Sequence, residues 1–141
     1  TEFAQNMLAS INQYRAEARM CGNDEMPAVE PLSWNCSLQQ SSLNHANDMG
    51  SNNFFSHTSS NGLQLSHRIN AVEYDWQAIG ENIAGGQTSI NEVMTGWINS
   101  EGHCRNIMSA NFTEVGAATV VYQNSNARTY WVQNFAAPWN R

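Results

Sequence analysis

Three short segments of the sequence each place an imidazole or a carboxylate in a glycine-rich or polar surrounding. They centre on His57 in FFSHT, on Glu81 in GENIA and on His103 in SEGHC. Two imidazoles and one carboxylate are a ligand set that zinc accepts, and the metal would lower the pKa of a water in its fourth position to about 7. No HExxH-type helix fixes the geometry of the three residues, so separate hydrogen bonds that each tie down one loop are the alternative to a shared site.

Two potential nucleophiles lie close to His103 along the chain. Cys104 directly follows it, but adjacent residues in a helix or turn point in different directions, so this order does not imply a Cys–His pair. Ser100 precedes His103 by three positions, which is within reach on one helical turn. A serine hydrolase that uses Ser100, His103 and Glu81 is therefore a second interpretation, although the sequence has no nucleophile elbow.

Hydrophobic periodicity and capping residues predict the helices that carry these segments. Apolar residues recur at helical spacing in four stretches that we expect to be helical: residues 2–19, the segment from an N-cap at Ser33 to Gly50, residues 63–71 and residues 89–100. The last of them begins with the capping box SINE, and Gly102 is expected to end it. His45 and His67 each lie alone on a predicted helix, where a histidine is usually structural.

The C-terminal third of the chain changes to the two-residue period of strands. Apolar residues alternate with small or polar ones over residues 115–121, a second β-rich run covers 130–135, and turn residues occupy 123–127 between them. This pattern predicts an antiparallel hairpin. Residues 79–86 predict a short extended piece bracketed by glycines. Helices first and a hairpin last, without βαβ alternation, indicate an α+β domain.

The composition is typical of a globular protein and excludes two classes of function. The 141 residues carry a net charge of −6 and only six basic residues, all of them arginine, and no basic stripe that could bind nucleic acid is visible. No apolar run approaches the roughly 20 residues that a membrane span needs. Only 13% of the residues are charged, whereas Asn, Ser and Gln are abundant, which indicates a secreted or periplasmic protein. Because the chain starts at Thr1 without Met, we expect that a signal peptide has been removed.

Four motifs together resemble, in the same order, the signature segments of the CAP superfamily. They are FFSHT, GENIA, GWINSEGHCRNIM and the terminal YWVQNFA. The superfamily comprises the cysteine-rich secretory proteins, the antigen-five venom allergens and the plant pathogenesis-related class-one proteins, and the chain looks most like the bacterial SCP-like extracellular proteins. The resemblance covers nearly the whole chain, so we expect residues 1–141 to form a single CAP domain.

The resemblance implies a fold and a site. The fold is an α–β–α sandwich with a small antiparallel sheet between helical layers. The site is a central cleft with two histidines and two acids, which in several relatives binds a divalent cation such as zinc. The motifs place the two histidines at His57 and His103, which would hold the metal, and the first glutamate at Glu81, which would support them. Asn82 matches the asparagine of the Gly-Glu-Asn motif and is expected to brace its loop.

The second acid of the family pattern is missing from this sequence. It should lie three residues after Trp97, and Ser100 stands at that position. Glu101 is a candidate substitute in the cleft, although one position along a helix rotates a side chain by about 100°. We therefore expect Ser100 and Glu101 beside the cleft and an incomplete acid–base set.

The resemblance also implies which of the three cysteines pair. By number alone, Cys21, Cys36 and Cys104 allow one disulfide and leave one thiol over. Similar bacterial sequences combine an Arg-x-Cys-Gly segment after the first helix with a Gly-His-Cys segment, and both occur here. This implies a Cys21–Cys104 disulfide, with Cys36 free or buried, in preference to Cys21–Cys36. The longer loop should stabilise the fold by about 4 kcal/mol in the chain-entropy model.

Function varies widely among proteins of this superfamily, so the resemblance defines the fold better than the activity. We expect a secreted binding module without enzymatic activity, with Zn²⁺ or another divalent cation in its cleft. Its partner would be an unknown protein, lipid or small molecule, and the protein itself would be a monomer. A protease or esterase that uses the same cleft and a carrier of sterols or other lipids are the alternative functions.

Overall fold

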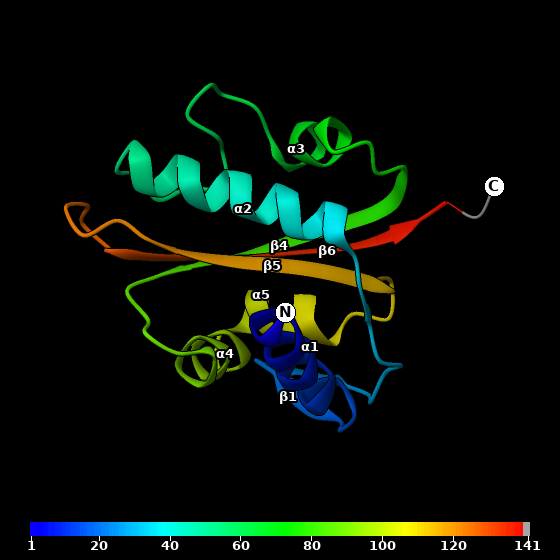
Figure 1. Ribbon diagram of the computed structural model, residues 1–141. Helices are drawn as coiled ribbons and strands as arrows, with labels where there is room; N and C mark the ends of the chain where they lie inside the picture. The colour runs from blue at the N-terminus through cyan, green and yellow to red at the C-terminus, as the bar shows by residue number, and fades with distance from the viewer. Residues whose placement is uncertain (140–141) are drawn as a thin grey trace.

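A four-stranded sheet lies between two layers of helices in the computed structural model, which describes residues 1–139 (Figure 1). The described residues form these helices and strands: α1 (Glu2–Arg15), β1 (Arg19–Cys21), β2 (Asp24–Met26), β3 (Ser33–Trp34), α2 (Cys36–Ser51), α3 (Leu65–Ala71), β4 (Trp76–Gly85), α4 (Ile90–Ile98), α5 (Glu101–Met108), β5 (Glu114–Val121) and β6 (Thr129–Pro138). Helices α2 and α3 cover one face of the sheet, and α1, α4 and α5 cover the other (Figure 1). The α–β–α sandwich expected from the sequence is confirmed.

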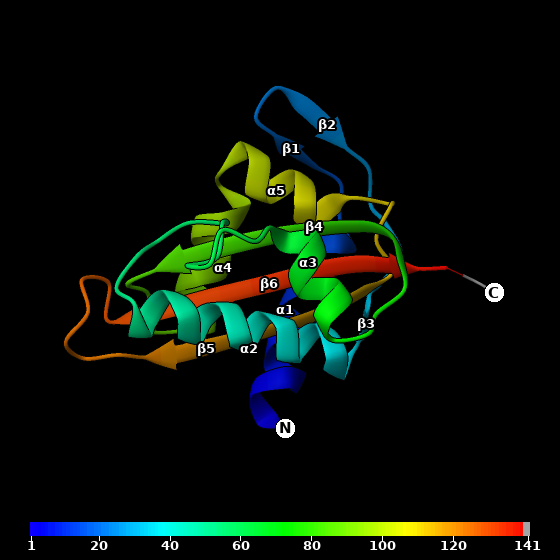
Figure 2. The ribbon, with the colours of Figure 1, turned by 90° about the horizontal axis from the view of Figure 1, so that it is seen from above.

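The strands of the main sheet follow the order β3-β5-β6-β4 (Figure 2). Strands β5 and β6 form the predicted antiparallel hairpin, and β4 pairs antiparallel with β6 along its length. β4 is ten residues long, more than the short piece predicted at 79–86. The two-residue strand β3 runs parallel to β5, so the sheet is not wholly antiparallel. As the last strand in the order, β4 has one side without a neighbouring strand.

The start of α2 differs from the sequence prediction because a strand forms just before it. Ser33 is not the N-cap; it belongs to β3, and its N–H donates to the carbonyl of Thr113 at 3.0 Å. Asn35 is the N-cap instead, since its side chain accepts a hydrogen bond from the N–H of Leu38 at 3.0 Å. An asparagine oxygen satisfies a free backbone donor at a helix start as well as a serine does.

The helix predicted over residues 89–100 is α4, and a second helix, α5, begins directly after that range. Ser89 caps α4 by accepting from the N–H of Glu92, as the capping box predicts. The backbone is extended at Ser100 (φ −110°, ψ 125°), whose carbonyl accepts the N–H of Cys104 and so begins α5. The expectation that Gly102 ends the helix is therefore wrong, because the helix has already broken and Gly102 lies inside α5.

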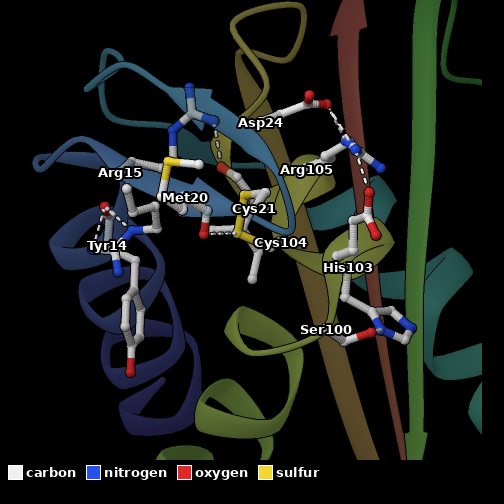
Figure 3. The surroundings of a disulfide bond; sticks show 12 residues. Tyr14, Arg15, Met20, Cys21, Asp24, Ser100, His103, Cys104 and Arg105 are labelled. Carbon is white, nitrogen blue, oxygen red and sulfur yellow. Dashed lines mark hydrogen bonds and ion pairs between the residues drawn. A yellow bond between two sulfur atoms is a disulfide. The ribbon is translucent and has the colours of Figure 1, made fainter.

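Helix α1 ends at Arg15, earlier than predicted, because the next residues enter the β1–β2 hairpin. A disulfide joins Cys21 in β1 to Cys104 in α5, with the two Cα atoms 5.5 Å apart (Figure 3). The pairing implied by the resemblance is present, and Cys36 is free and exposed. The hairpin is thus covalently tied to the helix that carries His103.

Alternate side chains of β6 face the two helical layers and form cores on both sides of the sheet. Trp131 and Phe135 pack with α1, α4 and α5, whereas Val132 packs with α2. At Gly116 in β5 a Cβ atom would lie 2.1 Å from the backbone nitrogen of Gln39, so only glycine lets α2 lie this close to the sheet. Among residues 1–139, none of the helices has the length and apolar character needed to cross a membrane.

Candidate functional site

A groove of about 550 Å³ lies beside the last residues of β4. His57 reaches it from the loop between α2 and α3, and His103 reaches it from α5. Ser100 lies on the same surface, and Phe55 and Trp97 line apolar parts of the groove. The two histidines singled out in the sequence therefore lie in one groove although they come from segments far apart in the chain.

His57 is held at the groove by its loop and by one carboxylate. Its Nδ1–H donates to Oε1 of Glu81 at 2.9 Å, and its carbonyl accepts from Nη2 of Arg68 at 2.6 Å. In α2 the buried imidazole of His45 donates from Nε2 to the carbonyl of Ser56 at 2.7 Å, which fixes the preceding residue. The His57 side chain is 56% exposed. Its Nδ1 is thus committed to the protein, whereas the rest of the ring is accessible from the groove.

Glu81 is buried, and both of its carboxylate oxygens accept hydrogen bonds. Besides the bond from His57, Oε1 accepts from Nη2 of Arg68 at 3.1 Å. Oε2 accepts from Nη1 of Arg68 at 2.5 Å and from Nδ2 of Asn134 at 2.8 Å. Burial alone would raise the pKa of this carboxyl, but the bonds from His57 and Arg68 and the charge of Arg68 lower it to about 2. The carboxylate is therefore ionised and orients His57, with its oxygens already occupied by protein donors.

His103 is held by Ser100 and by the neighbouring strand. Its Nδ1 lies 2.9 Å from Oγ of Ser100, and its carbonyl accepts from Nδ2 of Asn82 at 3.2 Å. Burial and, to a smaller degree, the charge of His57 lower the pKa of His103, so the imidazole is neutral at pH 7. Figure 3 shows that its side chain points away from the disulfide formed by Cys104. Cys104 is oxidised and faces the other way, so it cannot act with His103 as a nucleophile.

Glu101 does not take the place of the missing acid in the groove. Its side chain is 54% exposed, and its Oε1 accepts from Nη2 of Arg105 at 2.5 Å on the outer side of α5. The expectation that Glu101 lies in the cleft is wrong because one step along the helix from Ser100 turns the side chain away. Ser100 is therefore the residue that occupies the position of the second acid.

The Ser100–His103–Glu81 triad considered from the sequence is not assembled. Ser100 and His103 are within hydrogen-bond distance, but the carboxylate of Glu81 bonds His57 and Arg68. No carboxylate among residues 1–139 bonds the ring of His103. A hydrolase in this groove would have a serine–histidine pair without an acid to orient the imidazole.

His57 and His103 are the two groove side chains that could hold a metal ion. Within residues 1–139 no group of three or more His, Cys, Asp or Glu side chains is placed to hold a metal ion. The arrangement of His57, His103 and Glu81 as three direct ligands is therefore not formed, since the carboxylate is engaged elsewhere. The two imidazoles remain as donors that face the groove.

Three polar residues that hold the site escaped the sequence prediction. They are Arg68 and Asn134, which bond the Glu81 carboxylate, and Asn106, whose Nδ2 donates to the Glu81 carbonyl at 3.1 Å and to Oδ1 of Asn82 at 2.9 Å. The sequence contains one signal for Asn134: the polar pair Gln-Asn interrupts the apolar run YWVQNFAA. Two consecutive amides in a buried strand require partners on both faces of the sheet.

Comparison with known proteins gives matches along most of the chain. Residues 8–135 match the model of the CAP, or cysteine-rich secretory protein, family. The uncharacterized membrane protein YlbC of Bacillus subtilis is 32% identical over 108 residues, which are 77% of this chain and 29% of that protein. The uncharacterized protein YkwD of the same organism is 30% identical over 129 residues, 90% of this chain and 48% of that protein. The chain thus spans less than half the length of these two curated relatives.

Solved structures resemble this one over nearly its whole length. An extracellular protein with an SCP domain from Bacillus anthracis aligns with a TM-score of 0.78 and 29% identity, over 94% of this chain and 39% of that one. An outer surface protein from Borrelia burgdorferi aligns with a TM-score of 0.80 over 96% of this chain and 92% of that one. At 18% identity the second likeness concerns the fold alone.

Proposed function

Because the chain belongs to the cysteine-rich secretory protein family, we propose that it is an extracellular binding module whose groove holds a divalent cation such as Zn²⁺ between His57 and His103. The observation that carries the proposal is the convergence of the two imidazoles in one groove, each with its Nδ1 within hydrogen-bond distance of another side chain. When bound, the cation would offer open coordination positions to an oxygen, nitrogen or sulfur donor of the ligand.

The partner of each Nδ1 determines which nitrogen is free for a metal. A carboxylate only accepts, so the bond to Glu81 fixes the proton of His57 on Nδ1 and leaves the lone pair on Nε2. Nδ1 of His103 either donates to the hydroxyl of Ser100 or accepts from it. Donation leaves Nε2 of His103 with a lone pair, which is the tautomer that metal binding requires.

An extracellular location agrees with the covalent chemistry of the chain. Structural disulfides persist in oxidising compartments and are rare in the cytosol. The Cys21–Cys104 disulfide is buried, with exposed fractions of 1% and 0% for the two residues. The similar structure from Bacillus anthracis, at 29% identity, is that of an extracellular protein.

Isothermal titration with ZnCl₂ at pH 7.5 tests the cation site. We expect saturable binding to the wild-type protein and its loss in the double variant His57→Ala/His103→Ala. His67→Ala is the matched control, because His67 is exposed on α3 and does not line the groove. Far-UV circular dichroism melts would show that the variants are folded. Unchanged zinc binding in the folded double variant, or none in the wild type, would reject the site.

One observation favours a hydrolase as the second candidate function. If Ser100 donates its hydroxyl proton toward Nδ1 of His103, the 2.9 Å contact is that of a nucleophile and its base. Turnover of fluorogenic ester and peptide libraries, with and without EDTA, would detect such an activity. Turnover that disappears in Ser100→Ala would support the hydrolase, whereas its persistence in that variant would exclude Ser100 as the nucleophile.

A further inference from the structure

The outer edge of β4 carries backbone groups that no strand pairs. The N–H of Gly86 donates to the carbonyl of Thr129 at 3.0 Å. Together with the antiparallel register, this bond shows which residues of β4 are hydrogen-bonded to β6. Even-numbered residues of β4 therefore exchange hydrogen bonds with β6, and odd-numbered residues direct their N–H and C=O groups outward. Two bonds agree with this assignment: Asn106 donates to the carbonyl of Glu81, and Trp97 donates from Nε1 to the carbonyl of Ile83 at 3.0 Å.

The outward groups at the end of this edge have no partner within the described residues 1–139. They are the N–H of Ile83 and both the N–H and the C=O of Gly85. Ile83 and Gly85 both line the groove. A backbone donor and acceptor on one residue of a strand edge are what an added strand would pair with.

Gly96 on α4 lines the same groove and leaves open space where a side chain would lie. It lies in the interior of a helix, where glycine costs about 1 kcal/mol relative to alanine. A Cβ atom there would meet no atom within 4 Å, so packing inside the protein does not require the glycine. Gly96 is exposed, and the absence of a side chain there widens the groove.

A buried amide oxygen at the groove also has no donor. Oε1 of Gln87 is inaccessible to solvent and has no hydrogen-bond partner in residues 1–139, although the residue lines the groove. An unsatisfied buried acceptor costs about 1–3 kcal/mol. A ligand that brings an N–H or O–H group to this oxygen would remove that cost.

We propose that the groove binds an extended peptide, which adds as a strand to the outer edge of β4 at Ile83 and Gly85 and lies between Phe55 and Gly96. This inference rests on the proposed binding function and names the class of its ligand. Residues 83 to 85, the last of β4, span roughly 7 Å of strand, enough to pair with two or three residues of a ligand. Phe55 is 55% exposed and offers its ring to a ligand side chain.

The polar groups of the edge favour a peptide over an acyl chain. A peptide supplies an alternation of donors and acceptors that can satisfy the N–H and C=O of Gly85 and the amide oxygen of Gln87. An acyl chain would cover these groups without bonding them, at a cost in free energy for each.

Selection of phage-displayed random linear heptapeptides on the immobilised protein, in buffer with zinc and in buffer with EDTA, tests the proposal. Selected peptides would be synthesised with a fluorophore, and binding would be measured by fluorescence anisotropy. N-methylation of each peptide bond in turn should weaken binding at least tenfold at alternate positions, because only every second N–H faces the β4 edge. The amide of Gly85 should become protected from hydrogen exchange in the complex.

A pair of glycine variants separates the groove from the rest of the surface. Gly96→Leu should weaken binding of the selected peptides at least tenfold and remain folded, since leucine is a better helix former than glycine. Gly102→Leu is the matched control, because Gly102 also lies in a helix with no atom within 4 Å of a Cβ but does not line the groove. It should bind the peptides like the wild type.

Three results would overturn the proposal: no enriched peptide, equal binding by Gly96→Leu, or N-methylation effects without a two-residue period. Binding of a fluorescent fatty acid that Gly96→Leu abolishes, with no peptide selected, would assign the groove to acyl chains instead. Zinc titration separates this outcome from the cation proposal. Gly96→Leu should bind zinc like the wild type. If the wild-type protein binds the selected peptides but does not bind zinc, the peptide proposal stands and the cation site is rejected.

Discussion

The Nδ1 of His57 lies 2.9 Å from Oε1 of Glu81, and this bond gives the two histidines of the groove different surroundings. His57 has an ionised carboxylate behind it, which fixes the tautomer and the orientation of its ring. Within residues 1–139, the ring of His103 has the hydroxyl of Ser100 as its partner and no carboxylate. The groove is therefore asymmetric, and its two sides can be changed independently by substitution.

Glu81→Gln should destabilise the protein by about 3 kcal/mol at pH 7, because it leaves the largely buried guanidinium of Arg68 without its counter-charge. Urea unfolding followed by circular dichroism measures the change. Glu101→Gln is the control, since its ion pair with Arg105 is exposed and its loss should leave the free energy of unfolding unchanged within error. Equal destabilisation by the two variants would contradict the role assigned to Glu81.

The same carboxyl should make the protein sensitive to acid. Its folded-state pKa of about 2 lies below the ordinary value of 4.5, so its contribution is complete above pH 4.5 and is lost as pH falls toward 2. The loss is on the order of 3 kcal/mol. Free energies of unfolding measured from pH 6 to pH 2 should fall in this window for the wild type and fall less steeply for Glu81→Gln. Parallel curves for the two proteins would show that Glu81 is not responsible.

Elements with strong local signals could be predicted from the sequence, and those that depend on distant pairing could not. The capping box at Ser89 and the alternation in the C-terminal hairpin are local, and both were identified correctly. The strand at Ser33 forms only because β5 lies beside it, so the residue was mistaken for a helix cap. The chain leaves the helical conformation at Ser100, where α5 begins. The periodicity of apolar residues does not predict this break between α4 and α5.

The residues of the site also divide into those that local sequence motifs predict and those that depend on distant pairing. The histidine and glutamate motifs indicated which residues would meet, because they occur in polar segments that resemble a family pattern. The bond from Asn134 to Glu81 spans 53 positions and depends on the register of β4 against β6, which no local pattern encodes. The bond of Arg68 to Glu81 could not be predicted either, since a single arginine on a short helix gives no sign of its partner.

Restoring an acid at position 100 should strengthen the cation site. Ser100→Glu places a carboxylate in the groove beside His103, where the family pattern has one, and adds a third donor for zinc. We expect the zinc dissociation constant to fall roughly tenfold, about 1.4 kcal/mol. Ser100→Gln is the control, because it has the same size without the charge. Isothermal titration at pH 7.5 compares the three proteins, and equal affinity of the Glu and Gln variants would contradict a cation at this place.

Removal of the disulfide should destabilise the fold and loosen the support of His103. The bond closes a loop with a sequence separation of 83, for which the chain-entropy model gives about 4–5 kcal/mol. Cys21→Ala/Cys104→Ala should therefore melt at a lower temperature and bind zinc more weakly than the wild type. Cys36→Ala is the control, because its thiol is free and exposed. A double variant with wild-type stability would show that the noncovalent contacts of α5 suffice.

His45 should make the loop of His57 sensitive to mild acid. Burial is the largest influence on the pKa of His45 and lowers it. The charge of Arg68 also lowers it, whereas Glu81, the hydrogen bond to Ser56 and Asp48 raise it by smaller amounts. Its Nδ1 is buried and has no hydrogen-bond partner in the described residues. An unfolded histidine binds a proton below about pH 6.5, whereas protonation of the buried imidazole in the folded state is unfavourable. Stability is therefore complete above pH 6.5 and declines as pH falls toward the lowered pKa.

The variant His45→Gln removes this titration while its amide can still donate to the carbonyl of Ser56. Between pH 6.5 and 5 the wild type should lose more stability than His45→Gln, as measured by urea unfolding at each pH. Exposed His67, replaced by glutamine, is the control and should leave the pH dependence of the wild type unchanged. Hydrogen exchange of the loop between α2 and α3 should rise in the wild type over the same interval. If His45→Gln and the wild type lose stability in parallel, the buried imidazole is not the source of the acid sensitivity.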